Sequence, residues 1–179
     1  MLIFEIMKKL LTKITLLISL VLGIQGCDFL KNIDPKPKTE LEKLPPLTQT
    51  GKNTFGYLVN GKAIVVTNTL KITAIYQQGN LQLGGGVTNS SIDLDITIFP
   101  PFSPLEESVS YDITKYAQFY NFHDDCYYEL DDTYEGHIIF SKIDRTNYII
   151  SGTFEFSTVT SNCETARITN GRFDVQYTP

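Results

Sequence analysis

The sequence predicts an all-β fold, a single antiparallel β-sandwich or sandwich-like barrel of about nine to eleven strands over residues 51–179. From Phe55 onward, apolar and polar residues alternate with a period of two, most clearly in Ile92–Ile98. Turn signals recur at short spacing, and no stretch there has the period of a long helix. Both architectures fit this pattern, and periodicity does not choose between them.

Hairpins are expected at the two ends of this region. Phe55–Val59 and Lys62–Val66 flank Asn60-Gly61, a dipeptide typical of type I′ turns. The same dipeptide, Asn170-Gly171, predicts a last hairpin from strands at 165–169 and 172–177. Between the two hairpins, strands are expected at 70–77, 81–83 (after a turn at Gly79-Asn80), 92–98, 109–113, 117–120, 135–143 and 148–159.

Residues 1–26 have the organisation of a signal peptide. Three lysines precede the apolar run Ile14–Ile24, which is shorter than the ~20 residues of a membrane-spanning helix. The run ends in Ile24-Gln25-Gly26-Cys27, which resembles a bacterial lipobox. The resemblance implies cleavage before Cys27 and its lipidation, and so a lipid anchor in the bacterial cell envelope. We expect the outer membrane, with the domain on its periplasmic or surface face. Translation can also start at Met7, which opens a more cationic leader.

Residues 27–50 are expected to hold the lipidated Cys27 and a tether. The segment contains four prolines and alternating charges, with one possible helical turn at Glu40–Leu44. Removing residues 1–26 leaves 12 of the 15 basic and 19 of the 20 acidic residues, a net charge of −7. This acidic balance without a basic run argues against nucleic acid as a partner. The lipid is therefore the expected contact with the membrane.

The two remaining cysteines, Cys126 and Cys163, predict a disulfide, because export places them in an oxidising compartment. In a flat meander they would lie at opposite ends of the sheet, beyond the ~7 Å between Cα atoms that a disulfide allows. Three alternatives resolve this conflict: the sheet curls, residues 127–130 do not form a regular strand, or the thiols are free. We expect the second, with Cys126 in a loop beside the loop around Asn162.

Two parts of the chain resemble a known family. These are LPPLTQTGKNTFGYLVNGKA at 44–63, and NYIISGTFEFSTV at 147–159 together with RITNGRFDVQY at 167–177. They resemble a family of short lipoproteins from Bacteroidetes-type bacteria, a domain of unknown function. The resemblance implies an exported all-β lipoprotein. It implies no activity, so it assigns no catalytic or binding residue.

Candidate ligand-binding residues gather in the densest aromatic and acidic part of the chain. Tyrosines at a loop-rich rim can stack on sugar rings or on a protein partner, although alternate members of such a run also pack in a core. The candidates are Tyr116, Tyr120, Asp124, Asp125 and Tyr127. No metal site or cofactor is expected, because His123 and His137 have no recognisable ligand spacing.

The predicted function is a non-enzymatic binding or assembly domain on the envelope, recognising a glycan, a small ligand or a partner protein. One alternative is a structural or interaction subunit of an envelope complex. Another is a hydrolase that uses two carboxylates, with Asp93 and Asp95 on one face of a strand as its candidates. The G-x-S-x-G, P-loop and G-x-G-x-x-G motifs are all missing from the sequence.

Overall fold

The computed structural model describes residues 37–89, 93–99 and 104–179, together with residues 5, 7, 8 and 13. The chain divides into two units, 1–37 and 38–179. Almost all of the predicted signal peptide, and Cys27, the expected lipidation site, lie outside the described residues. Among the described residues, no helix has both the length and the apolar character needed to cross a membrane.

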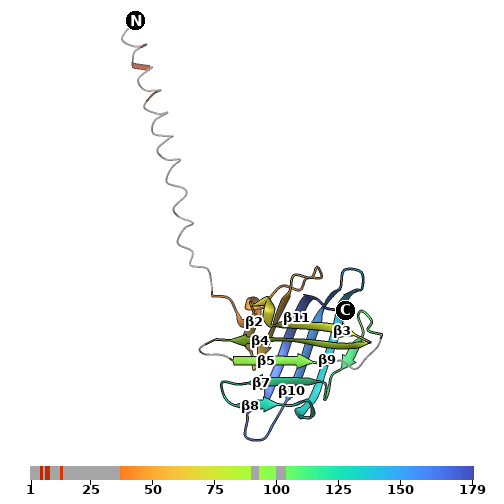
Figure 1. Ribbon diagram of the computed structural model, residues 1–179. Coiled ribbons are helices and arrows are strands. Elements are labelled where there is room, and N and C mark those ends of the chain that lie inside the picture. The colour runs from red at the N-terminus through yellow and green to blue at the C-terminus, as the bar shows by residue number, and fades with distance from the viewer. Residues whose placement is uncertain (1–4, 6, 9–12, 14–36, 90–92, 100–103) are drawn as a thin grey trace. The chain divides into compact units, whose positions relative to one another are not determined.

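Residues 38–179 form a sandwich of two antiparallel sheets that do not close into a barrel (Figure 1). The structure thus confirms the all-β sandwich. The larger sheet has the order β2 (Lys62–Val66), β1 (Thr54–Val59), β11 (Ala166–Gln176), β10 (Ile149–Thr158), β9 (Thr133–Asp144), β6 (Ser110–Asp112). The smaller sheet has the order β3 (Ile72–Gln77), β4 (Asn80–Thr88), β5 (Asp93–Ile98), β7 (Ala117–Asn121), β8 (Cys126–Tyr128).

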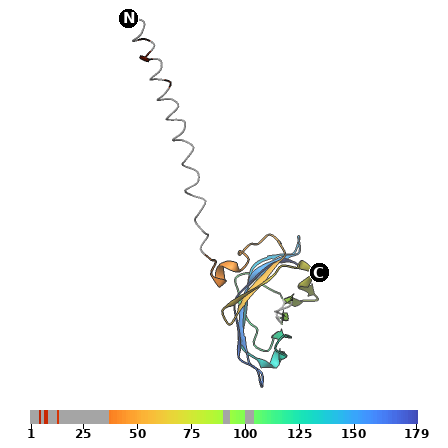
Figure 2. The ribbon, with the colours of Figure 1, turned by 90° about the vertical axis from the view of Figure 1, so that its left-hand side faces the viewer.

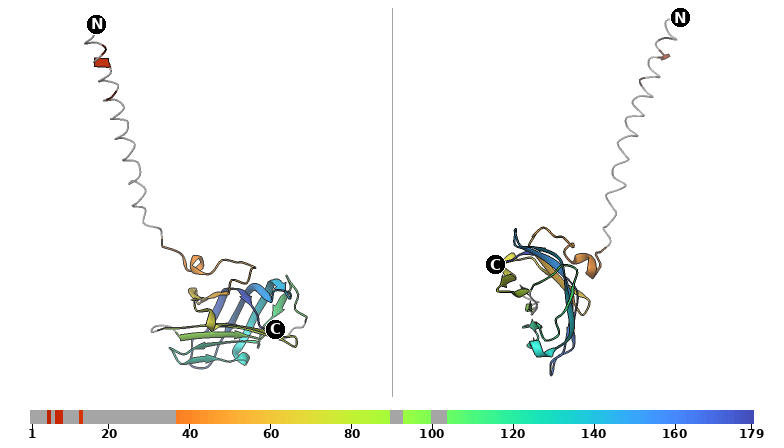
Figure 3. Two further views of the ribbon diagram at one scale, coloured as in Figure 1. Left: turned by 45° about the horizontal axis from the view of Figure 1, so that its top comes forward. Right: turned by 90° about the vertical axis from the view of Figure 1, so that its right-hand side faces the viewer.

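The larger sheet curves around the smaller one, as the edge-on view in Figure 2 shows. Figure 3 shows the same curvature from two further directions. The strands of the two sheets cross steeply in Figure 1, as in orthogonal sheet packing. The described residues of this unit also form three short helices: α2 (Glu40–Lys43), η1 (Thr69–Lys71) and η2 (Leu130–Asp132).

The core lies between the sheets and follows from strand alternation. In β5, Leu94, Ile96 and Ile98 are buried while the residues between them are only half-buried. They face large side chains of the other sheet, where Phe55 stacks on Phe154 with ring centroids 5.4 Å apart. Burial of these apolar side chains, each worth roughly 1.5–3 kcal/mol, is the main stabilising term of the sandwich.

The prediction of the first hairpin is confirmed, and the prediction of the last hairpin is wrong. Asn60 and Gly61 have φ angles of 47° and 83° and join β1 to β2 in a two-residue turn. Asn170 also has a positive φ, 52°, but it lies inside the continuous strand β11. The registers of β11 with both β1 and β10 shift at this point, so Asn170-Gly171 forms a β-bulge. Because β11 has a partner strand on each side, it does not fold back on itself.

The glycine run 84–86 also differs from expectation. The sequence predicts a strand that ends at Leu83, but β4 continues through all three glycines to Thr88. A Cβ on Gly85 would lie 2.8 Å from the Phe55 ring, and one on Gly84 would lie 2.3 Å from the carbonyl oxygen of Ile96. Here the glycines permit close packing on both faces of the strand.

Residues 38–50, which the sequence assigns to the tether, belong to the folded unit. The predicted helical turn is present as α2, capped by Thr39, and its Glu40 carboxylate accepts a hydrogen bond from the backbone N–H of Ala63 at 2.8 Å. Because Ala63 lies in edge strand β2, this contact satisfies an exposed edge N–H. Further along, Pro45 packs over Gly56, and its carbonyl accepts a hydrogen bond from Arg172.

Candidate functional site

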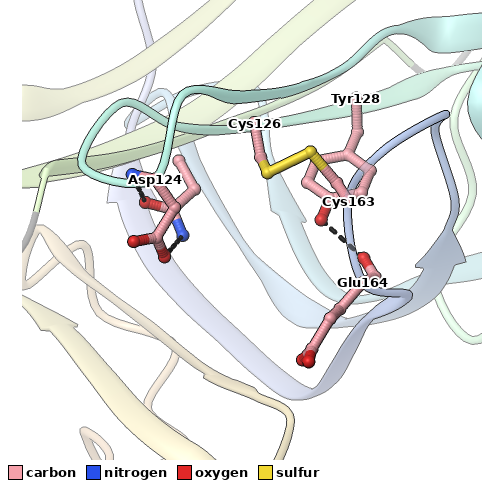
Figure 4. Close-up of a disulfide and its surroundings, with 6 residues drawn as sticks. Asp124, Cys126, Tyr128, Cys163 and Glu164 are labelled. Atoms are coloured by element: carbon pink, nitrogen blue, oxygen red, sulfur yellow. Dashed lines mark hydrogen bonds between the residues drawn. A yellow bond between two sulfur atoms is a disulfide. The ribbon is translucent and has the colours of Figure 1, made fainter.

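The predicted disulfide is present and joins the two sheets at one end of the sandwich (Figure 4). The Cα atoms of Cys126 and Cys163 are 6.0 Å apart. Cys126 begins strand β8 of the smaller sheet, so the expectation that it lies in a loop is wrong. Cys163 lies in the connection between β10 and β11 of the larger sheet. The two residues meet because they belong to facing sheets and not to one flat meander.

Beside the disulfide, the Tyr128 hydroxyl donates a hydrogen bond to the backbone carbonyl of Glu164 at 2.6 Å. This bond also connects the β8 side of the sandwich to the β10–β11 connection. The phenol ring of Tyr128 stacks on Phe119 in the core. Tyr128 therefore serves packing, which is what the alternation of β8 predicts for a residue on its inner face.

The outer face of the smaller sheet carries an aromatic triad formed by Tyr120, Phe122 and Tyr127. Their ring centroids lie 5.7 to 5.9 Å apart in all three pairs. Tyr120 and Tyr127 are direct partners across the β7–β8 ladder, and Phe122 follows the end of β7. The side chains of Phe122 and Tyr127 remain 45% and 43% exposed. The triad is thus a strand-supported group of rings open to solvent.

Carboxylates hold the two tyrosine hydroxyls of the triad. The Tyr120 hydroxyl donates to Glu129 at 3.0 Å, and partial burial together with this bond raises the pKa of Tyr120. A hydrogen bond to the Asp125 carboxylate raises the pKa of Tyr127. Both hydroxyls are therefore held in place by hydrogen bonds, and the remaining carboxylate lone pairs can accept hydrogen bonds from a ligand.

Asp95 borders the triad on the same outer face. It pairs directly with Tyr120 on one side and with Gly86 on the other. Its carboxylate fills the space that a Cβ on Gly86 would need, and the resulting burial raises the pKa of Asp95. Asp93 accepts a hydrogen bond from Thr88 at 2.9 Å. The two aspartates share one face, as predicted, but it is an open sheet face.

Two adjoining hollows lie between the sheets at the disulfide end, with volumes of about 360 and 440 Å³. They share the lining residues Val59, Asn60, Asn121 and Asp124. The two hydrogen bonds drawn at Asp124 in Figure 4 join it to the Asn121 side chain. Charged side chains line both hollows, and the second is also lined by the disulfide and Tyr128.

The predicted ligand-binding residues therefore separate into three places. Tyr120 and Tyr127 come together in the triad, and Asp125 joins its rim. Asp124 lies instead on the wall of the hollows. Tyr116 precedes β7, so it lies at the opposite end of that strand from Phe122. The described residues contain no group of three or more His, Cys, Asp or Glu placed to hold a metal ion.

Phe122 and Glu129 also belong to this site, although neither is among the ligand-binding residues that the sequence predicts. The signal was available in the period of β7, because Tyr120 and Phe122 are two residues apart and share a face. No family model matches the chain, and no curated protein or solved structure is detectably similar to it.

Proposed function

We propose that this protein is a lipid-anchored, non-enzymatic binding module of the bacterial cell envelope, and that its aromatic triad recognises neutral carbohydrate. The observation that carries the proposal is the exposed group of Tyr120, Phe122 and Tyr127, whose phenol hydroxyls are held by neighbouring carboxylates. Rings of this kind present an apolar face with a polar handle, which matches the apolar C–H face and hydroxyl rim of a sugar.

The surroundings of the triad favour a sugar over a flat apolar partner surface. Glu129, Asp125 and Asp95 surround the rings with hydrogen-bond acceptors, which suit the many hydroxyl donors of a glycan. The rings are supported by paired strands, so little side-chain and loop ordering opposes binding. The net charge of −7 on the chain after Gly26 disfavours anionic polysaccharides. A neutral glycan is the class that fits.

Anchoring in the envelope rests on the leader and is supported by the disulfide. The lipobox-like Ile24–Cys27 ends an apolar run of signal-peptide length. A disulfide between Cys126 and Cys163 is expected of an exported protein, since reducing compartments keep thiols free. Metabolic labelling with a clickable fatty acid tests this directly. Label should enter the wild-type chain and be lost in Cys27→Ala, whereas label retained in the variant contradicts lipidation at this residue.

The carbohydrate proposal is tested by titration calorimetry against neutral gluco-, manno- and xylo-oligosaccharides. The chain starting at Asp28 is used, because residues 38–179 contain all described strands, the core and the disulfide. Phe122→Ala and Tyr127→Ala should each weaken binding more than tenfold, because aromatic anchors dominate such surfaces.

Tyr134→Ala is the matched control, since Tyr134 is an equally exposed tyrosine on another strand, β9. It should bind as the wild type does. Oligosaccharide binding that survives both triad substitutions, or no binding across the panel, contradicts the proposal.

A further inference from the structure

We propose that the first hollow at the disulfide end is a second binding site, for a small zwitterion with an apolar side chain, the chemistry of an apolar α-amino acid. The hollow lies between the β1–β2 hairpin and the β7–β8 turn, one from each sheet. None of its lining residues belongs to the aromatic triad. The inference is therefore independent of the carbohydrate proposal.

Part of the lining of the hollow is apolar, and the hollow is of ligand size. Val59, Ile64 and Leu94 contribute aliphatic side chains from both sheets. Its volume of about 360 Å³ lies within the ~300–1,000 Å³ that small-molecule pockets occupy. An aliphatic side chain entering the hollow removes apolar surface from water on both partners, which favours binding.

Two opposite charges line the hollow from different sheets. Lys62 begins β2 of the larger sheet, and Asp124 lies in the β7–β8 turn of the smaller sheet. Among the described residues, neither side chain forms an ion pair, with the other or with a third group. The Glu40 carboxylate interacts electrostatically with Lys62, Asn121 donates a hydrogen bond to Asp124, and His123 also lines the hollow. Because neither Lys62 nor Asp124 has an ion-pair partner among the described residues, a cation and an anion remain beside an apolar surface.

Hydrogen bonds hold the walls of the hollow in place. Asn121 donates to one Asp124 carboxylate oxygen at 2.7 Å and accepts from the Asp124 backbone N–H at 3.2 Å, which fixes the direction of that carboxylate. On the opposite wall, the Asn60 amide donates to the carbonyl of Thr165 and accepts from the N–H of Arg167. These bonds join the β1–β2 turn to β11. A site held in this way binds with little ordering of its own groups.

The charge arrangement selects the ligand class. A simple anion would meet Lys62 but also the carboxylate of Asp124, and a simple cation would meet Asp124 but also Lys62. A zwitterion satisfies both when its ammonium group faces Asp124 and its carboxylate faces Lys62. The aliphatic side chain then lies against Val59, Ile64 and Leu94. Opposite charges on the two partners give specificity in this way, because each mismatched charge is penalised.

The test is titration calorimetry of the chain from Asp28 with four probes. L-Leucine carries all three features; leucinamide lacks the carboxylate, 4-methylpentanoate lacks the ammonium group, and glycine lacks the side chain. We expect leucine to bind with a sub-millimolar Kd and each of the other three to bind at least tenfold more weakly. Lys62→Met should weaken leucine binding tenfold or more and abolish the preference for leucine over leucinamide. Asp124→Asn should do the same for leucine over 4-methylpentanoate.

Two control variants make the result decisive. Lys52→Met removes a lysine that is exposed elsewhere and should leave leucine binding unchanged. Tyr127→Ala changes the triad and should also leave it unchanged, which separates this site from the carbohydrate site. No leucine binding at 10 mM overturns the proposal, as does binding that leucinamide or 4-methylpentanoate matches. Leucine binding that is equally strong in Lys62→Met and Asp124→Asn overturns it as well. Both substitutions replace exposed side chains, and circular dichroism verifies that each variant is folded.

Discussion

Asp174 is the buried carboxylate that holds residues 48–52 against the larger sheet. It is 1% exposed and accepts five hydrogen bonds. The donors are the hydroxyls of Thr48 and Ser151 at 2.6 and 2.7 Å, and the backbone N–H groups of Thr50, Gly51 and Lys52 at 3.1, 2.7 and 3.3 Å. Burial alone would raise the pKa of Asp174, but the hydrogen bonds outweigh it and lower the pKa from 3.8 to about 2.

This pKa shift sets the size and the direction of a pH effect on stability. A difference of nearly two pH units between the unfolded and folded states corresponds to about 2.5 kcal/mol of unfolding free energy. Because the folded-state pKa is the lower one, the contribution is fully present above about pH 5. It is lost as the pH falls through 3.8 and then through about 2. Stability should therefore drop in acid.

The substitution Asp174→Asn isolates this contribution. Asparagine keeps one acceptor oxygen, but its amide N–H group would face the donors that now bind the second carboxylate oxygen of Asp174. We therefore expect the unfolding free energy to fall by about 3 kcal/mol at pH 7. Other carboxylates titrate equally in both chains, so the difference between wild type and variant reports on Asp174 alone. That difference should narrow by about 1.5 kcal/mol between pH 7 and pH 2.5.

Urea unfolding followed by circular dichroism at pH 7, 4 and 2.5 measures both quantities. Asp144→Asn is the control, because the Asp144 carboxylate also accepts backbone hydrogen bonds and also has a lowered pKa, but in an exposed turn. It should change stability little at any pH. A difference between wild type and Asp174→Asn that stays constant with pH would refute the assignment of the effect to the Asp174 charge.

Three further variants test the disulfide and the packing. The double variant Cys126→Ser/Cys163→Ser should lose about 4 kcal/mol of unfolding free energy, because the bond closes a loop with a sequence separation of 37 residues; thermal unfolding that matches the wild type would contradict this. Gly171→Ala should lose about 1–3 kcal/mol, since the added Cβ would lie 2.6 Å from the Phe154 ring. Asn170→Gly at the same bulge should be nearly neutral, because glycine readily adopts the positive φ of Asn170. Equal urea midpoints for Gly171→Ala and Asn170→Gly would argue against the bulge.

Strand alternation predicted most of the fold because it reports burial directly. Most expected strands are present with ends shifted by a few residues, and β5 keeps the alternation that identified it. What alternation does not contain is the partner of each strand. Asn60-Gly61 and Asn170-Gly171 are the same dipeptide and both place Asn at positive φ. The first is a turn at a sheet edge, whereas the second is a bulge between two neighbouring strands.

The same limit explains why only part of the candidate site could be predicted. Tyr120 and Tyr127 were identified by composition, but their meeting requires the β7–β8 register, which pairs them directly. Asp124 and Asp125 are adjacent in sequence, yet Asp125 contacts the triad and Asp124 faces the hollow. Asp125 lies in the tight turn between β7 and β8 and has a positive φ of 55°. The two aspartates of this turn therefore serve different surfaces.

The hollow itself depends on contacts between sheets, which no local pattern encodes. Lys62 and Asp124 are separated by most of the smaller sheet in the sequence, and they line one hollow only because the sandwich brings two hairpin ends together. The disulfide joins the facing sheets at this same end. A bond that holds the sheets together here also fixes the spacing of the walls. Titration calorimetry of the Cys126→Ser/Cys163→Ser variant should therefore show that leucine binding is weakened more than carbohydrate binding, because the triad lies within one sheet and the hollow lies between two.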